Sequence, residues 1–251
     1  MIRVNSLNVA ERLLPLSFSC QPGEVLHIVG PNGSGKSTLL SALSGVIESA
    51  GDVLLDEIDL RKCSLSELAL RRAYLSQNEK PAFNLDVFQY LALSVPKCTS
   101  LDNPKVSEAV NQLTGLLKIS DKLHRSIHQL SGGEWQRVRL AGSCLQIWPA
   151  INPYAKLLVL DEPSAPLDIA QEGLLYKLID KMAGEGLAIV MANHDLNRTL
   201  RHADNVLLLE QGIAQCFGPP SLVLSEDNLR KVFDTSVKSV TVEGKPYLVF
   251  D

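Results

Sequence analysis

The sequence predicts an α/β fold in which a mostly parallel core sheet carries an antiparallel β part at its N-terminal end and an inserted α-helical segment. The first observation behind this prediction is a set of continuous apolar runs, at residues 157–160, 187–191 and 206–209. Strands that are apolar throughout are typical of a parallel sheet that helices cover on both faces. The second observation is a change to helical spacing of apolar residues across residues 78–148, which predicts the insertion.

The elements before the insertion are predicted mainly as strands. Residues 1–20 alternate loosely between apolar and polar types, which favours two short strands around a turn. Further strands are predicted at residues 25–29, 52–56 and 73–76. A helix is expected over residues 64–72, with Ser64 or Ser66 as its N-cap and Glu67 in its first turn.

Helices are predicted for the insertion, and strands alternate with a helix after it. The expected helices lie at residues 107–117, 132–147 and 170–183. The last of them separates two of the apolar strands, as parallel pairing requires. Residues 240–249 are typical of a closing hairpin.

Length and composition indicate one large domain, since 251 residues with 45% apolar side chains can bury a substantial core. We expect a core formed by residues 1–77 and 154–215, a helical subdomain at 78–148, and a C-terminal tail with the hairpin at 216–251.

Charge and residue usage argue against several classes of protein. The net charge of −4 disfavours a nucleic-acid partner, which usually meets a basic face. No apolar run approaches the roughly 18 residues of a membrane helix, and no leader peptide is visible, so we expect a chain that does not cross a membrane by itself. The 5 cysteines are scattered and contain no Cys-x-x-Cys pair, which favours reduced thiols.

The stretch from Gly30 to Ser37 fits the phosphate-loop pattern, in which a glycine and four further residues precede Gly-Lys-Ser. An apolar run precedes it and a helix-compatible run follows, as the motif requires. Gly33 and Gly35 allow successive N–H groups to point at one anion, and the helix end adds positive potential. The alternative is a glycine-rich turn that leads into a helix by accident. The predicted nucleotide-binding residues are Gly30, Pro31, Asn32, Gly33, Ser34, Gly35, Lys36, Ser37 and Thr38.

Two side chains of this loop and two carboxylates suit a nucleotide with a metal ion. Lys36 can reach the outer phosphates, and the Ser37 hydroxyl can coordinate Mg²⁺. Asp161 and Glu162 end an apolar strand, and ligands lie beyond the carboxyl ends of such strands. We expect Asp161 to bind Mg²⁺ directly or through water, and Glu162 to act as general base on a water beside the terminal phosphate. Taken alone, a strand that ends in solvated charges is the alternative.

Residues 130–137 form a second unusual stretch, in which Ser131 precedes two glycines and opens a helix. Such a helix end can bind an anion, although an ordinary N-cap is the alternative. Its place in a series favours function: the phosphate loop comes first, then Gln77 after a strand, then this stretch, then Asp161, and finally His194 after another strand.

This ordered set resembles the ATP-binding cassette (ABC) ATPases over nearly the whole chain. The resemblance implies a P-loop NTPase core of the RecA-like type and a head-to-tail homodimer that binds ATP and Mg²⁺ between its copies. It implies that a signature sequence covers the ATP of the partner copy, with the residues Ser131, Gly132, Gly133 and Glu134. Gln77 is implied to contact Mg²⁺ and His194 the terminal phosphate, so that both join Glu162 in the catalytic set, while Asp168 is implied to couple the two sites.

Three of these residues have plainer alternatives when each is taken alone. Gln77 would be a polar residue of the surface, and His194 would be a structural histidine with its own hydrogen bonds. Asp168 would be the N-cap of the helix that follows it. Only the ordered set favours the functional interpretation.

Two positions depart from the pattern of this family. Residues 8–14 contain no aromatic side chain to stack on adenine, so Arg12 or an apolar residue such as Val9 would take that place, and GTP could compete with ATP. Pro166 stands where a more flexible residue is usual, before Leu167 and Asp168.

A single cassette implies separate partners: two membrane permease subunits and, indirectly, a periplasmic substrate-binding protein. The chain itself is expected to be peripheral, at the cytoplasmic face of the bacterial inner membrane. Residues 73–77 and 194–203 are similar to importers of iron chelates, haem and cobalamin. Residues 130–141 and 186–203 together favour the cobalamin importers. An iron-siderophore or haem importer, an exporter and a non-transport ABC ATPase remain alternatives.

The surface near residues 83–90 is the expected contact with the permease, because it follows Gln77 directly. The alternative is that Phe83, Val87 and Tyr90 belong to the hydrophobic core.

Overall fold

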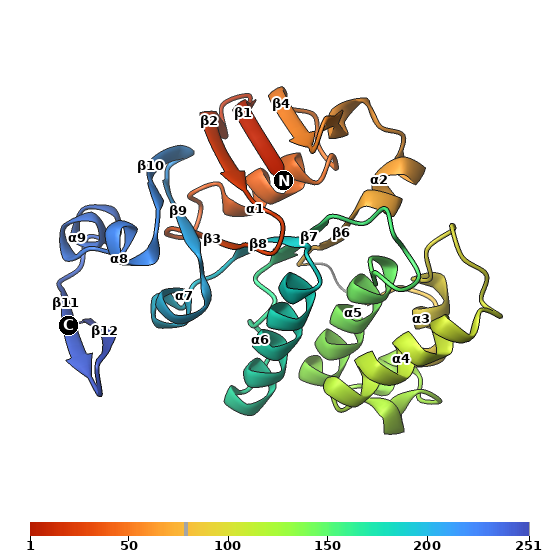
Figure 1. The fold of residues 1–251 in the computed structure, drawn as a ribbon. Helices are drawn as coiled ribbons and strands as arrows, with labels where there is room; N and C mark the ends of the chain where they lie inside the picture. Colours follow the sequence, from red (N-terminus) through yellow and green to blue (C-terminus); the bar gives the residue numbers. More distant parts are fainter. Residues whose placement is uncertain (78–79, 251) are drawn as a thin grey trace.

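A six-stranded sheet forms the centre of the computed structural model, which describes residues 1–77 and 80–250. Its strand order is β10-β9-β3-β8-β7-β6 (Figure 1). The parallel strands are β3 (Val25–Val29), β6 (Arg72–Leu75), β7 (Leu157–Asp161), β8 (Ala188–Ala192) and β9 (Asn205–Glu210). At one edge, β10 (Ile213–Gly218) runs antiparallel to β9. The predicted mostly parallel core sheet is therefore confirmed.

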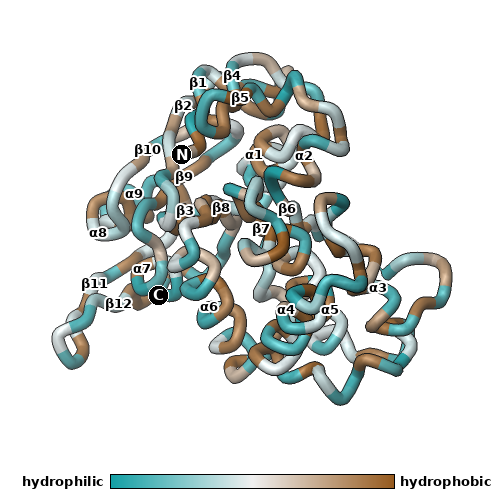
Figure 2. The backbone as a smooth tube through the Cα atoms, turned by 45° about the vertical axis from the view of Figure 1, so that its right-hand side comes forward, coloured by the Kyte–Doolittle hydropathy of each residue, from teal (hydrophilic) through white to brown (hydrophobic). Residues whose placement is uncertain are grey.

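Every residue of β3, β7 and β8 is buried, which explains why these strands are continuous apolar runs. Figure 2 shows hydrophobic residues concentrated along these central strands. Because parallel strands point the same way, the carboxyl ends of β3, β6, β7 and β8 meet at one edge of the sheet. That edge is where the sequence places the phosphate loop and the chemistry-bearing side chains.

The N-terminal β part is a separate antiparallel sheet, as expected, with the order β2-β1-β4-β5. Its strands are β1 (Ile2–Val9), β2 (Leu13–Cys20), β4 (Ala50–Leu55) and β5 (Ile58–Asp59). Alternate residues such as Ile2 and Val4 are buried, and they pack with Leu39 and Leu40 of α1 (Lys36–Leu43). One core cluster thus joins this sheet to one face of the central sheet, with α1 between them (Figure 1).

The inserted segment is helical, as predicted, and comprises α3 (Val87–Leu93), α4 (Pro104–Leu116) and α5 (Gly132–Gln146) together with two 3-10 turns. Helix α4 begins three residues before the predicted start, because Asn103 caps it and Pro104 fits the first turn. The insertion packs on the other face of the central sheet through a second core cluster that includes Leu113 and Trp135.

Helices outside the insertion also match their sequence signals. Helix α2 (Leu65–Arg71) is capped by Ser64 in a capping box with Glu67, which decides between the two serines. Helix α6 (Ile169–Gly184) lies within one residue of its predicted bounds. Helix α7 (Leu196–His202), by contrast, is not predicted from the sequence. Only Leu196 and Thr199 of its residues are buried, so it carries no apolar stripe that would signal a helix.

The C-terminal part contains α8 (Pro220–Val223), α9 (Glu226–Phe233) and the predicted hairpin of β11 (Val237–Val242) and β12 (Lys245–Phe250). Strand β10 extends on both sides of residue 215, so the expected core and tail share it, and the division into core, helical subdomain and tail stays a prediction.

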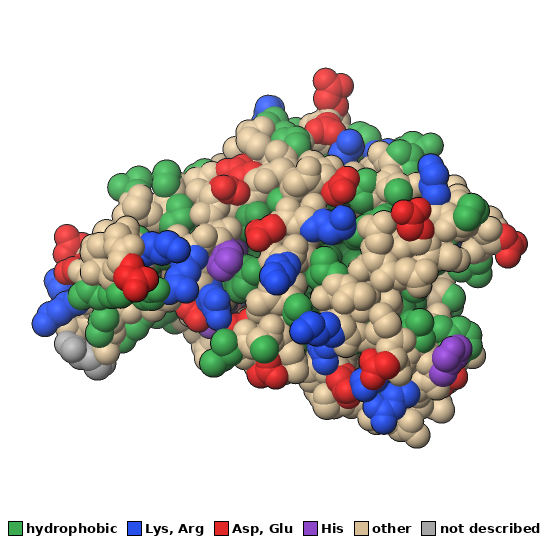
Figure 3. Space-filling model, turned by 60° about the horizontal axis from the view of Figure 1, so that its bottom comes forward, with side chains coloured by type: hydrophobic (Ala, Val, Ile, Leu, Met, Phe, Trp, Pro, Cys, Tyr) green, Lys and Arg blue, Asp and Glu red, His purple; other side chains and the backbone are tan. Residues whose placement is uncertain are grey.

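All 5 cysteines are free thiols in the structure, in line with the sequence. In the described part of the chain, no helix is both long enough and apolar enough to span a bilayer. On the face shown in Figure 3, acidic and basic side chains are interspersed and hydrophobic side chains lie between them.

Candidate nucleotide-binding site

A cavity of about 720 Å³ lies at the carboxyl edge of the central sheet. Its lining combines residues from the phosphate loop, from strand ends and from two turns: Glu11, Arg12, Asn32, Gly33, Ser34, Gly35, Lys36, Ser37, Thr38, Gln77, Glu162 and Gln211. The structure thus brings together segments that are more than a hundred residues apart in sequence. The predicted loop residues Gly30 and Pro31 lie behind this lining, where their carbonyl groups contact Lys36.

The phosphate loop has a backbone that only glycine allows at two points. Gly30 has φ +156°, and a Cβ atom there would overlap the carbonyl oxygen of Leu209. Gly35 has φ +102° and is the N-cap of α1, without a side chain to cap the helix. No side chain caps α1, and its first residues, 36–38, line the cavity, so this helix N-terminus can serve as an anion site.

Lys36 is nearly buried at 5% exposure, and its ammonium group donates to the carbonyl oxygens of Gly30 at 2.9 Å and Pro31 at 3.1 Å. Burial lowers the pKa of Lys36, while the nearby carboxylates of Glu162 and Asp161 raise it. A buried cation in the first turn of a helix suits a phosphate anion.

Asp161 ends β7 and is buried, with its carboxylate accepting a 3.1 Å hydrogen bond from Ser37 Oγ. Burial raises the pKa of Asp161 first of all, and the Ser37 hydroxyl and Lys36 lower it. A desolvated carboxylate beside a hydroxyl is a pair of oxygen ligands that suits Mg²⁺. Among the residues described, no cluster of three or more His, Cys, Asp or Glu side chains is placed to hold a metal ion.

Glu162 and His194 contact each other, which brings two predicted catalytic residues to one point. Glu162 follows β7 in a left-handed backbone conformation with φ 50°, and His194 follows β8. The Nε2 atom of His194 contacts Oε1 of Glu162, while half of the histidine remains exposed. Glu162 lines the cavity and Gln77, after β6, lines it too. Four strand ends thus deliver the predicted set.

The signature residues lie elsewhere, at the start of α5, and are absent from the lining of the cavity. Ser131 and Glu134 form a capping box: Ser131 Oγ accepts from the Glu134 N–H at 3.2 Å, and the Glu134 carboxylate accepts from the Ser131 N–H at 2.9 Å. The N-cap alternative is therefore confirmed as local structure, and Ser131 remains exposed.

Gly132 and Gly133 lie between those two capping residues and pack toward the start of α6. A Cβ atom at Gly133 would overlap Gln171 Oε1 and lie 3.2 Å from the carbonyl oxygen of Pro166. Asp168 is the N-cap of α6, since its carboxylate accepts from the Gln171 N–H at 2.8 Å. The N-cap alternative for Asp168 is confirmed, and its exposed position beside the signature leaves a coupling role open to test.

Two lining residues, Glu11 and Gln211, have no counterpart in the sequence predictions. Both lie in turns that meet only in the folded chain, where the Leu14 N–H donates to the Gly212 carbonyl oxygen at 2.8 Å. Of the two candidates for contact with the base, Arg12 lines the cavity, whereas Val9 packs against the core.

These features define a phosphate-loop ATPase of the cassette type, and the comparisons agree. Residues 13–165 match the model of the ABC transporter family, so the chain belongs to that family. It is 62% identical, over the whole of both chains, to the "Vitamin B12 import ATP-binding protein BtuD" of Vibrio cholerae serotype O1 (strain M66-2). The protein with that name in Vibrio atlanticus (strain LGP32) is 61% identical, again over both whole chains.

Solved structures resemble the chain in fold. An inward-facing metal-chelate type ABC transporter matches with a TM-score of 0.79 at 21% identity, covering 100% of this chain and 96% of that one. The cbiO1 protein of Clostridium perfringens, part of the ABC transporter complex cbiONQ, matches with a TM-score of 0.74 at 27% identity and covers 92% of each chain. A dimeric bacterial ABC transporter cassette matches with a TM-score of 0.74 at 22% identity, over 88% of this chain and 99% of that one.

Proposed function

We propose that this chain is the ATP-hydrolysing subunit of a vitamin B12 (cobalamin) importer and that two copies work head to tail. The observation that carries the chemistry is the meeting of three strand ends at one cavity, which Lys36, Ser37, Gln77 and Glu162 line and where Asp161 accepts a hydrogen bond from Ser37. The substrate rests on the name of relatives that are 62% identical over the whole of both chains.

The predicted site residues each have a proposed task. The N–H groups of residues 33–38 and the Lys36 ammonium bind the phosphates of ATP. Ser37 and Asp161, together with Gln77, would hold Mg²⁺, which when bound neutralises charge on the phosphates. Glu162 accepts a proton from the attacking water, and His194 orients its carboxylate through their mutual contact and reaches toward the terminal phosphate.

The nucleobase end of the cavity is assigned to Arg12. Its main chain is anchored, since the Arg12 N–H donates to the Val9 carbonyl oxygen at 2.8 Å and its own carbonyl lies against Gly35 and Gly212. A guanidinium plane stacks on any base, so we expect weaker discrimination between ATP and GTP than an adenine-specific contact would give.

The second half of each site comes from the partner copy. Residues Ser131, Gly132, Gly133 and Glu134 cover the nucleotide that the other copy holds, and Asp168 beside them couples the two sites. Support comes from the exposure of Ser131 at a helix N-terminus away from its own cavity. A cassette of the same fold is dimeric in its solved structure.

The remaining partners are two membrane permease subunits and, through them, a periplasmic substrate-binding protein, while this chain lies at the cytoplasmic face of the inner membrane. Phe83 is 62% exposed and Phe88 is 44% exposed, so they supply apolar contact area on the inserted segment. Val87 is buried in the core, and Tyr90 packs edge-on against Trp135, so the core alternative holds for these two.

Reconstitution tests the proposal. The chain is combined with the two permease subunits of its own organism's cobalamin importer in vesicles, and ATP-dependent uptake of cobalamin is compared with uptake of a ferric siderophore and of haem. We expect uptake of cobalamin alone, abolished by Glu162→Gln. Uptake of an iron chelate instead would replace the substrate assignment, and ATP hydrolysis without binding to any permease would favour a non-transport ATPase.

A further inference from the structure

Two side chains of α5 connect the backbone segments that carry the water-activating residues. The guanidinium Nη2 of Arg139 donates to the carbonyl oxygen of Ser76, the residue before Gln77. Its Nη1 donates to Gln136 Oε1 at 3.1 Å. Gln136 Nε2 in turn donates to the carbonyl oxygen of Pro163 at 2.8 Å. An unbroken chain of hydrogen bonds therefore runs from the backbone beside Gln77 to the backbone beside the proposed general base.

The Gln136 end of this chain is buried and holds a backbone that needs support. Gln136 is 5% exposed, and its bond to Pro163 is fully buried, so the carbonyl has no water to replace it. Glu162, one residue earlier, has φ 50°, a conformation that costs free energy for a residue with a side chain. Such a conformation persists because neighbouring contacts fix it, and Gln136 supplies one of them.

The signature end of α5 is close to both of these contacts. Ser131 caps the helix, and Gln136 and Arg139 follow one to two turns later, about 7 to 12 Å along the axis. A further contact joins the same regions, since Lys80 Nζ donates to the carbonyl oxygen of Leu130 at 2.8 Å. Figure 1 shows α5 running next to β6, the strand that leads into Gln77.

We propose that Arg139 and Gln136 are positioning residues that hold Gln77 and Glu162 in register with the signature end of α5. The inference rests on the proposed function, because it assigns tasks to Gln77 and Glu162. Arginine suits the place, since its planar fork serves two acceptors in different directions and a lysine ammonium does so less well. A nucleotide of the partner copy that contacts residues 131–134 thereby contacts α5, the same helix whose side chains hold Gln77 and Glu162 of this copy.

The test compares steady-state ATP hydrolysis by the purified full-length chain and its variants. Arg139→Ala removes the contact to Ser76, and we expect kcat to fall about 10- to 100-fold, as for a small misplacement of reacting groups. The affinity for ATP should stay unchanged, because the phosphate loop is intact. Arg139→Lys keeps one donor and should restore part of kcat. Gln136→Glu keeps an acceptor for Arg139 but loses the donor to Pro163. It should lower kcat even though the contact between Arg139 and Ser76 is kept.

A double-mutant cycle with Gln77→Ala separates positioning from a merely structural role. If Arg139 acts through Gln77, then Arg139→Ala costs little or nothing further in kcat once Gln77 has been replaced. If Arg139 only stabilises the fold, it costs the same factor in both backgrounds.

Gln146 provides the matched control on the same helix. Its Nε2 donates to the carbonyl oxygens of Ala69 in α2, at 2.7 Å, and of Arg72 at the start of β6, at 3.1 Å, rather than to the end of β6. Gln146→Ala removes contacts of the same kind and should lower the melting temperature without lowering kcat.

The outcomes separate this inference from the proposed function. A wild-type chain that does not hydrolyse ATP, alone or with its permease, would overturn the proposed function and the inference with it. A wild-type chain that hydrolyses ATP while Arg139→Ala keeps its kcat, or while the cycle is additive, overturns the inference alone. If Arg139→Ala does not fold, Arg139→Lys and Gln136→Glu decide: normal kcat in both variants contradicts the positioning role.

Discussion

A single carboxylate distinguishes binding from hydrolysis in the cavity. Glu162→Gln keeps the size of the side chain and an oxygen for contact with His194, but it removes the group that accepts a proton. We expect ATP hydrolysis to fall by about 10²- to 10⁴-fold, the usual contribution of a general base. ATP affinity should persist, because Lys36 and the phosphate loop are unchanged, so the variant should accumulate as an ATP-bound dimer that gel filtration detects.

The control for this variant is Glu185→Gln, which removes the same charge from an exposed position at the end of α6. It should hydrolyse ATP at the wild-type rate. Full turnover by Glu162→Gln would rule out Glu162 as the base and would turn attention to His194 or to the phosphate itself.

His27 makes the stability of the protein depend on pH. The ring is fully buried in β3, with Nδ1 3.0 Å from Thr199 Oγ1. Burial, with a smaller contribution from His202, lowers the pKa of His27 to about 3. Between about pH 6.5 and 3 the unfolded chain therefore binds a proton at this residue that the folded chain does not, so the free energy of unfolding falls as the pH falls, by up to about 1.4 kcal/mol per pH unit.

His27→Asn isolates this contribution, because asparagine keeps a polar group near Nδ1 and does not titrate. Urea unfolding of both proteins from pH 7 to pH 4.5 gives the two slopes of stability against pH. At the acid end, we expect the free energy of unfolding of the wild type to change more steeply with pH than that of His27→Asn. The difference should be about 1.4 kcal/mol per pH unit, because the unfolded wild-type chain binds one more proton. Equal slopes would mean that His27 is solvated or protonated in the folded state.

At the scale of elements, long periodic segments are predictable and short ones are not. The predicted helix at residues 132–147 is α5 at Gly132–Gln146, because its many buried residues leave a clear helical pattern. Strand β10 shows no alternating pattern of buried residues, since Gly218 is its only buried residue. Its pairing with β9 comes from the turn at residues 211–212.

The candidate site likewise contains residues that the sequence predicts and residues that only the folded chain reveals. Ordered motifs predict the loop, Asp161, Glu162 and His194, because each follows a recognisable strand. The lining by Glu11 and Gln211 depends on two distant turns meeting through the hydrogen bond at Gly212, and no local pattern encodes such a meeting. The placement of Ser131 away from its own cavity is likewise visible only in the fold.

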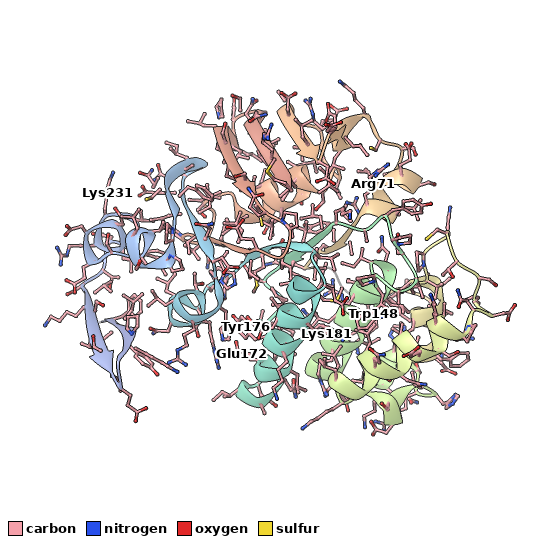
Figure 4. All side chains as sticks on the ribbon, viewed as in Figure 1. Arg71, Trp148, Glu172, Tyr176, Lys181 and Lys231 are labelled. Atoms are coloured by element: carbon pink, nitrogen blue, oxygen red, sulfur yellow. The ribbon has the colours of Figure 1, made fainter. Side chains whose placement is uncertain are left out.

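The contact between α6 and α7 depends on Tyr176, which stacks on His202 with ring centroids 3.9 Å apart. Figure 4 shows Tyr176 and Glu172 on the side of α6 that faces α7, where Glu172 pairs with Arg198 at 3.1 Å. The Tyr176 hydroxyl accepts a buried 3.0 Å hydrogen bond from Asn193 Nδ2, next to His194.

Tyr176→Phe removes that hydroxyl, so the buried side-chain amide of Asn193 loses the oxygen to which it donates. We expect a loss of about 1 to 3 kcal/mol in the free energy of unfolding, measured by urea denaturation. Tyr154→Phe is the control, because Tyr154 is 54% exposed and should lose almost nothing. A similar small change in both variants would mean that water satisfies Asn193 and that the hydrogen bond to Tyr176 adds little.

For the whole molecule, the decisive question is whether each nucleotide site draws on two copies. Lys36→Ala damages the phosphate-binding half of a site, and Ser131→Arg damages the signature half. In a homodimer of either variant, both composite sites carry one damaged half, so each homodimer should hydrolyse ATP poorly.

A mixed dimer of the two variants distributes the damage differently. The phosphate loop of the Lys36→Ala chain meets the signature of the Ser131→Arg chain, which concentrates both defects in one site, while the other site is assembled from two intact halves. Mixing should therefore restore hydrolysis, toward half of the wild-type rate if the sites act independently. Nucleotide binding by Ser131→Arg alone should be close to normal at low protein concentration, because its own cavity contains no signature residue. Restored ATP hydrolysis that depends on the concentration of the mixed dimer would support the composite site. Full activity of the Ser131→Arg homodimer would mean that Ser131 is not needed for hydrolysis.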